Sequence, residues 1–355
     1  MYLLWYCKRS LEFVSSSIIM INNEGSDSVK ATIKDIAKAT HLSTATVSRV
    51  LSRKEGTYRE ETARKVLAAA EKLGYRRNIA AADLASNNLK TIAVILNNTQ
   101  TNFWQGILDG IQEAAIRNQR QFIIFYAGNN NPAMLTQALN NALERQIAGI
   151  LLVATKMNPE QMAMLHRANI PYRFVSIYDS DQPDRTFVSS NNISIGRLAC
   201  QYLIEQGHKK IAFAGLDRSA TGRERLLGYQ QAMTKAGLPI DPSWIIYGDY
   251  SFANGQALFP KLQQAGVTAV VAASDMIGAG IIQAAHHAHV AIPDNLSIVS
   301  IDGTEVCLMV TPTLTCIQQD FFKMGAASLD SLLTEGESQF IPVKVVENNS
   351  VKSIN

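Results

Sequence analysis

Cysteine is scarce in this chain, with four residues among 355. A disulfide-stabilised protein of this length would need more, and their wide spacing forms neither a CxxC pair nor a zinc motif. We therefore expect reduced thiols, in a cytoplasmic protein, at Cys7, Cys200, Cys307 and Cys316. Charged residues make up 18% of the chain and hydrophobic residues 47%, which excludes disorder over most of its length. No apolar run approaches the ~18 residues that a membrane helix requires, so we expect no membrane-spanning segment.

Catalytic motifs are also absent from the sequence. It contains no G-x-S-x-G elbow, no Walker loop and no H-E-x-x-H pair, which argues against a hydrolase or a kinase. Residues 278–280 (GAG) begin like a dinucleotide fingerprint, but the sixth position is glutamine and the segment is predicted to be helical. His286, His287 and His289 lack acidic or cysteine companions, so we interpret them as surface residues rather than metal ligands. We predict no enzyme activity, no cofactor and no metal site.

Residues 1–30 match no targeting signal. Lys8 and Arg9 separate two short apolar pieces, whereas a secretory signal carries its positive charge ahead of one longer apolar run. We interpret this segment as a disordered extension, or as the product of a start codon upstream of the true one. A weak membrane or partner anchor is the alternative. Periodic, well-capped sequence begins only at Ala31.

Positive charge is concentrated near the start of the chain. Residues 30–90 contain thirteen Lys or Arg and six Asp or Glu, whereas the remainder contains 20 and 24. A small basic module joined to a larger acidic body is typical of a nucleic-acid-binding head on a regulatory domain. Charge alone is a weak indicator, because solvated basic faces are common.

The pattern within this head predicts three short helices. Thr32 and Asp35 have the spacing of a capping box, and apolar residues then recur at helical spacing. Ser43 caps a second helix over residues 44–51, and the short connection predicts a helix-turn-helix. A third helix is expected over residues 60–73, with its inward residues at Ala63, Val66, Leu67 and Ala70.

The second helix suits docking in the DNA major groove. Its small side chains allow a close approach to the duplex. Thr46 and Ser48 can bond phosphates, and Arg49 can reach a guanine edge. A structural three-helix bundle without DNA binding is the alternative.

These stretches resemble the headpiece of the lactose-repressor/galactose-repressor family of bacterial transcription factors. The matching motifs are TIKDIA from residue 32, LSxxTVSRVL from residue 42, TxxKV from residue 62 and LGY from residue 73. The resemblance implies a hinge helix over residues 78–85, with a leucine that enters the minor groove and kinks the DNA. The expected DNA contacts are Ser43, Thr44, Ala45, Thr46, Ser48, Arg49, Asn78 and Leu84, of which Thr44, Ala45 and Arg49 occupy base-reading positions.

Three residues depart from the pattern of that family. His41 stands where the family has its turn glycine, Arg77 replaces the proline before the hinge, and Arg59 replaces the usual cap of the third helix. A non-glycine residue in a left-handed turn costs some strain.

From Thr91 onward, strand-like and helix-like segments alternate. Apolar runs predict strands over residues 91–96, 121–126, 148–153 and 172–177, and a second set over residues 210–215, 244–249, 268–273 and 297–302. Such runs suit parallel strands covered on both faces. We predict a small all-α head on an α/β core of two doubly wound lobes, whose strands end at a shared cleft. The expected divisions are 1–30 extension, 31–77 head, 78–89 hinge and linker, 90–340 core and 341–355 C-terminal tail.

The family resemblance covers this core, which is similar to periplasmic sugar-binding proteins. It implies that the core serves dimerisation and effector sensing. A sugar site needs planar hydrogen-bonding groups and flat aromatic rings. The expected effector contacts are Phe103, Trp104, Arg225, Tyr250, Ser274 and Asp302. Core packing is the alternative for each aromatic residue. Asn191 stands where the family has aspartate, and we expect this replacement to change the local hydrogen bonding.

Together, these features predict a repressor that binds double-stranded operator DNA as a homodimer under the control of a small effector, a sugar or sugar derivative. We expect an operator of roughly 14–20 base pairs. The sequence VENNSVKSIN after residue 345 has no leucine heptads, so we do not expect a tetramer. Three alternatives remain open: a catabolite-control-type regulator activated by a protein co-repressor, a sugar-binding transport protein, and a sugar-processing enzyme.

Overall fold

The computed structural model describes residues 31–52, 57–75, 89–97, 99–101, 103–129, 131–178 and 185–355. The chain divides into two compact units, residues 1–82 and 83–355. The predicted extension and most of the predicted hinge, including Asn78 and Leu84, lie outside the described residues.

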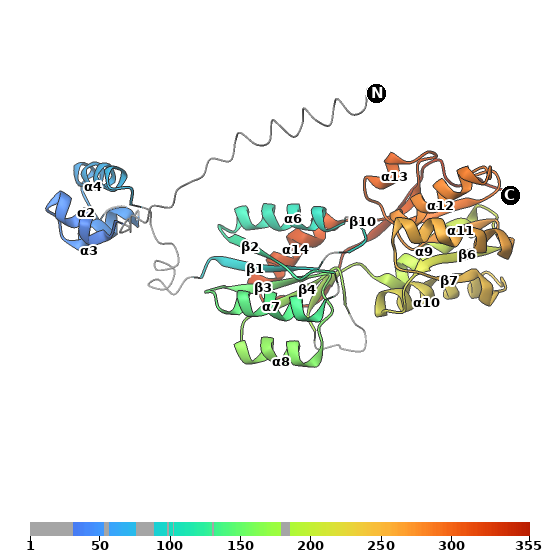
Figure 1. Cartoon of the computed structure of the whole chain (residues 1–355), viewed down its shortest axis with the longest axis horizontal. Helices are drawn as coiled ribbons and strands as arrows, with labels where there is room; N and C mark the ends of the chain where they lie inside the picture. Colours follow the sequence, from blue (N-terminus) through green and yellow to red (C-terminus); the bar gives the residue numbers. More distant parts are fainter. Residues whose placement is uncertain are drawn as a thin grey trace, which may run out of the picture. The chain divides into compact units, whose positions relative to one another are not determined.

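The described part of the head contains three helices (Figure 1): α2 (Ile33–Thr40), α3 (Thr44–Leu51) and α4 (Glu60–Lys72). The capping box between Thr32 and Asp35 is present at the start of α2. The three helices share a small core formed by Ile36, Ala37, Val47, Val50, Val66 and Ala70. The prediction that Leu67 points inward is wrong, since its side chain is 54% exposed. Val66 and Ala70 define the buried face of α4, and Leu67 lies about 100° around the helix from Val66.

The first lobe is built on a sheet with the strand order β11-β5-β4-β3-β1-β2. Its strands are β1 (Thr91–Leu96), β2 (Gln121–Tyr126), β3 (Gly149–Val153), β4 (Tyr172–Val175), β5 (Phe187–Ser189) and β11 (Gln339–Phe340). Its helices are α6 (Trp104–Arg117), α7 (Pro132–Leu143), α8 (Pro159–Ala168) and α14 (Phe321–Leu333). Successive residues of a strand point to opposite faces, so Val94 packs with α6 and α14 while Ile95 packs with α7 and α8.

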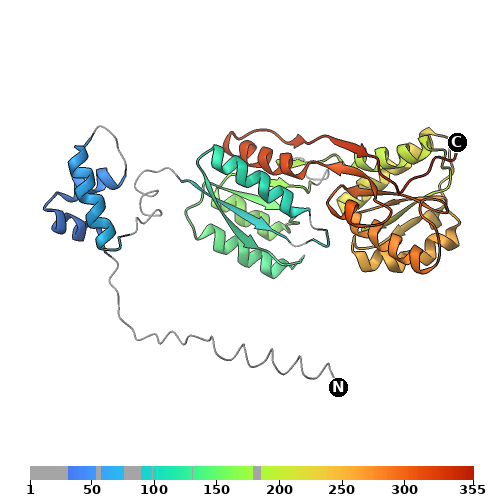
Figure 2. The same ribbon diagram turned by 90° about the horizontal axis from the view of Figure 1, so that it is seen from above.

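The second lobe repeats this plan, with the strand order β12-β10-β9-β8-β6-β7. Its strands are β6 (Ile211–Leu216), β7 (Ile245–Tyr247), β8 (Ala269–Ala272), β9 (Ser297–Asp302), β10 (Thr315–Gln319) and β12 (Val343–Val346). Its helices are α9 (Asn192–Glu205), α10 (Ala220–Lys235), the 3-10 turn η1 (Pro242–Trp244), α11 (Phe252–Ala265), α12 (Asp275–His287) and α13 (Val306–Met309). Helix α9 packs on α10 and α11 packs on α12, with the sheet between the two pairs (Figure 2).

The chain crosses between the lobes three times: from β5 to α9, from β10 to α14 and from β11 to β12. The predicted C-terminal tail at residues 341–355 is therefore wrong, because this segment belongs to the core. Strand β12 pairs antiparallel with β10. Ser350 is fully buried, and its hydroxyl donates to the carbonyl of Ile298 at 2.6 Å.

The eight predicted strands are present with small changes of length, but β2 differs in burial. We expected it to be covered on both faces, which is wrong. It lies at the edge of its sheet, and Ile124 and Tyr126 are 45% and 53% exposed. Helices cover a strand at the edge of a sheet less completely than a central strand. The apolar run in the sequence does not show that β2 is an edge strand. Strands β5, β10, β11 and β12 were not predicted, being short or interrupted by polar residues.

Candidate DNA-binding surface and effector cleft

The start of α3 is held by side-chain capping. The hydroxyl of Ser43 accepts a hydrogen bond from the backbone N–H of Thr46 at 3.1 Å and lies 2.9 Å from the Thr46 hydroxyl. The turn before α3 passes through His41 in a left-handed conformation, with φ 54° and ψ 36°. The cap satisfies a backbone N–H at the start of α3, and Val47 and Val50 in the shared core hold the helix against α2.

The outer face of α3 carries the residues expected to contact DNA. Val47 and Val50 face the core, whereas the outer face is formed by exposed Ser43, Thr44, Ala45, Ser48 and Arg49 and half-buried Thr46. A convex helix face of small side chains and one arginine fits the major groove. Within the head, the predicted contacts at residues 43–49 thus lie together; their contact with bases remains a prediction.

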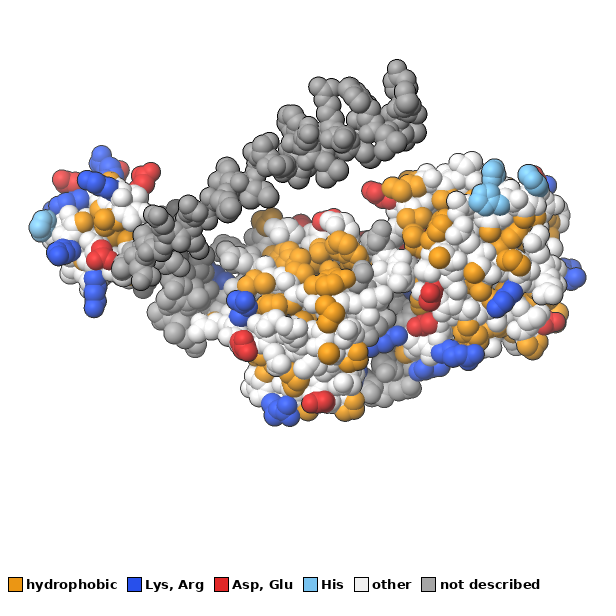
Figure 3. Space-filling model, viewed as in Figure 1, with side chains coloured by type: hydrophobic (Ala, Val, Ile, Leu, Met, Phe, Trp, Pro, Cys, Tyr) orange, Lys and Arg blue, Asp and Glu red, His pale blue; other side chains and the backbone are white. Residues whose placement is uncertain are grey.

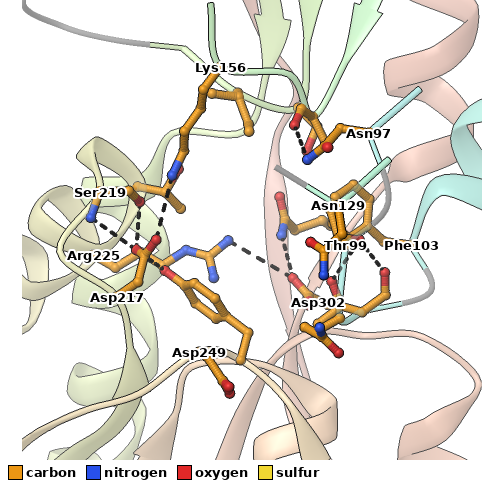
Figure 4. A pocket seen from close by; sticks show the side chains of 18 residues that line it. Asn97, Thr99, Phe103, Asn129, Lys156, Asp217, Ser219, Arg225, Asp249 and Asp302 are labelled. Atoms are coloured by element: carbon orange, nitrogen blue, oxygen red, sulfur yellow. Dashed lines mark hydrogen bonds and ion pairs between the residues drawn. The ribbon is translucent and has the colours of Figure 1, made fainter. Parts of the chain in front are cut away.

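A pocket lies between the lobes, at the carboxyl ends of their parallel strands (Figure 4). The first lobe supplies Phe103 and Lys156, and the second supplies Arg225, Tyr250 and Asp302. Open α/β sheets bind ligands at this edge, because the loops after the strands converge there. We refer to this pocket as the cleft; its other lining residues are Asn97, Thr99, Gln100, Thr101, Asn129, Ala154, Ser176, Ile177, Asp217, Ser219, Thr221, Asp249 and Gln319.

Arg225 is the centre of a buried polar network. Its Nη2 lies 3.9 Å from Oδ1 of Asp302, its Nε donates to Asn192 at 3.1 Å, and its Nη1 donates to the carbonyl of Ala273 at 3.0 Å. Helices α9 and α10 approach closely enough for this because Gly196 has no side chain. A Cβ there would lie 1.9 Å from the carbonyl oxygen of Arg225.

Asp302 is the last residue of β9, and its side chain is buried, which disfavours the charged form of the carboxyl group. Burial raises the pKa of Asp302 to about 8, because desolvation outweighs the attraction of Arg225. Gln319 donates to its Oδ1 at 2.8 Å. The backbone of Asp302 has φ 119°, and that of Tyr250 has φ 67°. Positive φ at non-glycine residues stores strain, which tends to collect at functional sites.

Tyr250 and Asp217 form a second network on the same lobe. The Tyr250 hydroxyl donates to Asp217 Oδ1 at 2.9 Å, and the Ser219 hydroxyl donates to the same oxygen at 2.6 Å. Burial raises the pKa of Tyr250, so its hydroxyl stays protonated and remains a donor.

The cleft brings together four of the six predicted effector contacts: Phe103, Arg225, Tyr250 and Asp302. Trp104 and Ser274 do not line it. Trp104 begins α6 and packs, half-buried, against the core of the first lobe. Ser274 is fully buried, where its hydroxyl caps α12 and donates to the carbonyl of Tyr250 at 2.8 Å. Ser274 therefore supports the backbone of a lining residue rather than facing the cleft.

Sequence reasoning missed several lining residues, including Asn97, Lys156, Asp217 and Gln319. A signal was available, because Asn97 and Asp217 directly follow β1 and β6 and Gln319 ends β10. Polar residues at strand ends point toward a ligand edge, but which of them face one another depends on how the lobes meet.

Two protein-family models match separate parts of the chain. Residues 32–78 match "Bacterial regulatory proteins, lacI family", and residues 200–348 match "Periplasmic binding protein-like domain". Catabolite control protein A of Staphylococcus xylosus is 30% identical over 308 residues, which cover 86% of this chain and 92% of that protein. The chain belongs to the lacI family of bacterial regulatory proteins. It is a DNA-binding transcriptional regulator with an effector-binding domain, and the family is not enzymatic.

Solved structures of lacI-family regulators share the fold. The lac repressor dimer bound to operator and the anti-inducer ONPF is 25% identical, with a TM-score of 0.81 over 91% of this chain and 99% of that one. The regulator CCPA from Weissella paramesenteroides with bound sucrose is 26% identical, with a TM-score of 0.67 over 75% of this chain and 100% of that one. The predicted fold class and family are confirmed, and transport-protein and enzyme alternatives are excluded.

Two further findings apply to the described ranges only. No helix there is long and apolar enough to cross a membrane, and no group of three or more His, Cys, Asp or Glu is placed to hold a metal ion.

Proposed function

We propose that this lacI-family regulator is a repressor acting in the cytoplasm, and that a small carbohydrate bound in the cleft controls its binding to operator DNA. The observation that carries the proposal is the convergence of Arg225, Asp302 and Tyr250 with Phe103 from the opposite lobe. A ligand held by both lobes changes the angle between them, and a change of this kind can reach the head through the segment that joins the two units.

The chemistry of the cleft supports a sugar. Each sugar hydroxyl both donates and accepts, so a hydroxyl beside the Arg225–Asp302 pair finds an acceptor and a donor together. Phe103 supplies a flat apolar surface, and its ring stacks on Phe321 with centroids 4.9 Å apart. The Weissella relative contains sucrose, which agrees with a carbohydrate effector here.

We further propose a homodimer on the operator. The support comes from an apolar surface on the first lobe, over α6 and β2 (Figure 3), where exposed side chains include Ile116, Ile124 and Tyr126. Exposed apolar residues on an edge strand favour burial against a partner. The lac repressor structure is a dimer on its operator. Sedimentation of the DNA-bound protein as a monomer or a tetramer would contradict this part of the proposal.

The test combines operator binding with ligand binding. A gel shift of purified protein on genomic operator fragments, with and without a panel of sugars, sugar phosphates and nucleobases, should identify a sugar that alters operator affinity. The same sugar should raise the melting temperature of the protein, because a ligand that binds only the native state stabilises it. A response to nucleobases alone would contradict the carbohydrate assignment.

A second candidate is a regulator activated by a protein co-repressor. The observation in its favour is the 30% identity to catabolite control protein A of S. xylosus. The two candidates differ in one measurement. A sugar-controlled repressor binds its operator as a purified protein, whereas a partner-activated regulator binds tightly only when the partner protein is added.

A further inference from the structure

One ion pair bridges the two lobes at the cleft. Lys156 comes from the loop after β3 in the first lobe, and Asp217 directly follows β6 in the second. The Lys156 Nζ lies 3.6 Å from Asp217 Oδ2, and Figure 4 shows the lysine side chain reaching from its own lobe toward the carboxylate of the other. Both residues line the cleft, so this contact forms part of the surface that meets a bound effector.

Asp217 is held as a charged group at neutral pH. Burial raises its pKa, but hydrogen bonds from Ser219 and Tyr250, together with the charge of Lys156, more than offset that effect and place the pKa below its usual value. The Ser219 and Tyr250 hydroxyls bond Oδ1, which leaves Oδ2 for Lys156. The lysine therefore faces a fixed negative charge.

The other cation among the described lining residues is also engaged. Arg225 lies beside Asp302 and donates to Asn192 and the carbonyl of Ala273. The third lining carboxylate, Asp249, accepts hydrogen bonds from the backbone and hydroxyl of Ser251. The described lining thus combines two cations with three acidic side chains. Burial raises the pKa of Asp302, so the lasting negative charge beside a lining cation is that of Asp217.

We propose that the effector is an uncharged carbohydrate, and that the Lys156–Asp217 pair excludes its phosphorylated counterpart. This inference rests on the proposed function, since it names the class of sugar that the same cleft accepts. A phosphate binds where cations or backbone N–H groups are available to it. Here it would have to displace Asp217 from Lys156 and leave the half-buried Asp217 carboxylate beside a like charge. Neutral hydroxyls can hydrogen-bond to both members of the pair and leave it intact.

The experiment measures discrimination between matched ligands. Neutral mono- and disaccharides, each paired with its own 6-phosphate, are titrated by calorimetry into the full-length wild type, Asp217→Asn and Asp294→Asn. Asp294 pairs with Lys352 at 2.8 Å on the surface of the same lobe, so its variant is the control for losing a carboxylate outside the cleft. Operator gel shifts with each ligand pair provide a second readout.

The wild type and the Asp294→Asn control should bind a neutral sugar at least about tenfold more tightly than its phosphate. In Asp217→Asn, the lysine keeps its charge but loses its carboxylate partner, so the preference should shrink by about tenfold. Tighter binding of a phosphate by the wild type, or unchanged discrimination in Asp217→Asn, would overturn the inference while leaving a carbohydrate effector in place. If neither form of any sugar binds or alters operator affinity, the carbohydrate effector itself is wrong, and this inference fails with it.

Discussion

In the head, Thr44, Ala45, Ser48 and Arg49 lie exposed on one face of α3, whereas in the core Arg225 and Asp302 are only 7% and 4% exposed. The two arginines illustrate the difference. Within the described part of the head, the guanidinium of Arg49 makes no hydrogen bond or ion pair. Arg225 lies beside the carboxyl group of Asp302 and donates to the amide of Asn192 and the carbonyl of Ala273. An exposed side chain can be lost at little cost to folding, but a buried one serves binding and stability at once.

The largest effect is expected for Arg225→Ala. Its removal leaves the buried amide oxygen of Asn192 and the carbonyl of Ala273 without their donor, at about 1–3 kcal/mol each, so the free energy of unfolding should fall by about 2–6 kcal/mol. The response of operator binding to the effector should also disappear. Urea unfolding and an effector-titrated gel shift measure the two losses. The control is Arg223→Ala, an exposed position on the same helix, which should change the free energy of unfolding by no more than about 0.5 kcal/mol. Equal free energies of unfolding for the two variants would contradict the difference between exposed and buried arginines.

The next effect is a pH dependence of stability that arises at Asp302. Its pKa is about 8 in the folded protein, against an ordinary value of 3.8, so the folded state holds a proton that the unfolded state has released. The free energy of unfolding should therefore decrease as pH rises toward about 8 and level off above it. Asp302→Asn cannot ionise. The melting temperature of this variant minus that of the ligand-free wild type should increase from pH 5 to pH 8, and a constant difference would contradict the raised pKa.

A smaller effect is expected for Leu84→Ala in the predicted hinge. If Leu84 enters the minor groove, each copy should lose the roughly 1.5–3 kcal/mol that a buried leucine contributes. Operator affinity and DNA bending should fall, while the affinity of DNA-free protein for its effector stays the same. Gel shifts on circularly permuted operator fragments measure the operator affinity and the DNA bending. Unchanged affinity and bending would exclude the hinge function.

The smallest effect is expected for Arg49→Ala. It should weaken specific operator binding by about 1–3 kcal/mol and relax base preference at one position per half-site. Because Arg49 is exposed, the unfolding midpoint should not change. Binding to a non-operator duplex is the control. Equal losses on both duplexes would mean that Arg49 touches only phosphates.

The head was predicted in detail because its signals are local. The Thr32–Asp35 capping box and the Ser43 cap involve residues three apart, and both are present. The prediction was wrong at Leu67, where an apolar residue next to the buried stripe lies exposed. In the core, β1 and β9 were placed correctly from their apolar runs. The exposure of β2 was not predicted, since an apolar run does not tell a central strand from an edge strand.

By itself, the sequence determined the helix-turn-helix and the alternation of strands and helices in the core, and the family resemblance named four of the residues that line the cleft. The helices and strands follow from spacing along the chain, because helix caps and strand periodicity depend on near neighbours. Only the tertiary structure decided that residues 343–355 complete the second lobe, that Ser274 supports Tyr250, and that Lys156 meets Asp217. Those contacts join residues far apart in the sequence. They depend on how two sheets linked by three crossovers meet, which no local pattern specifies.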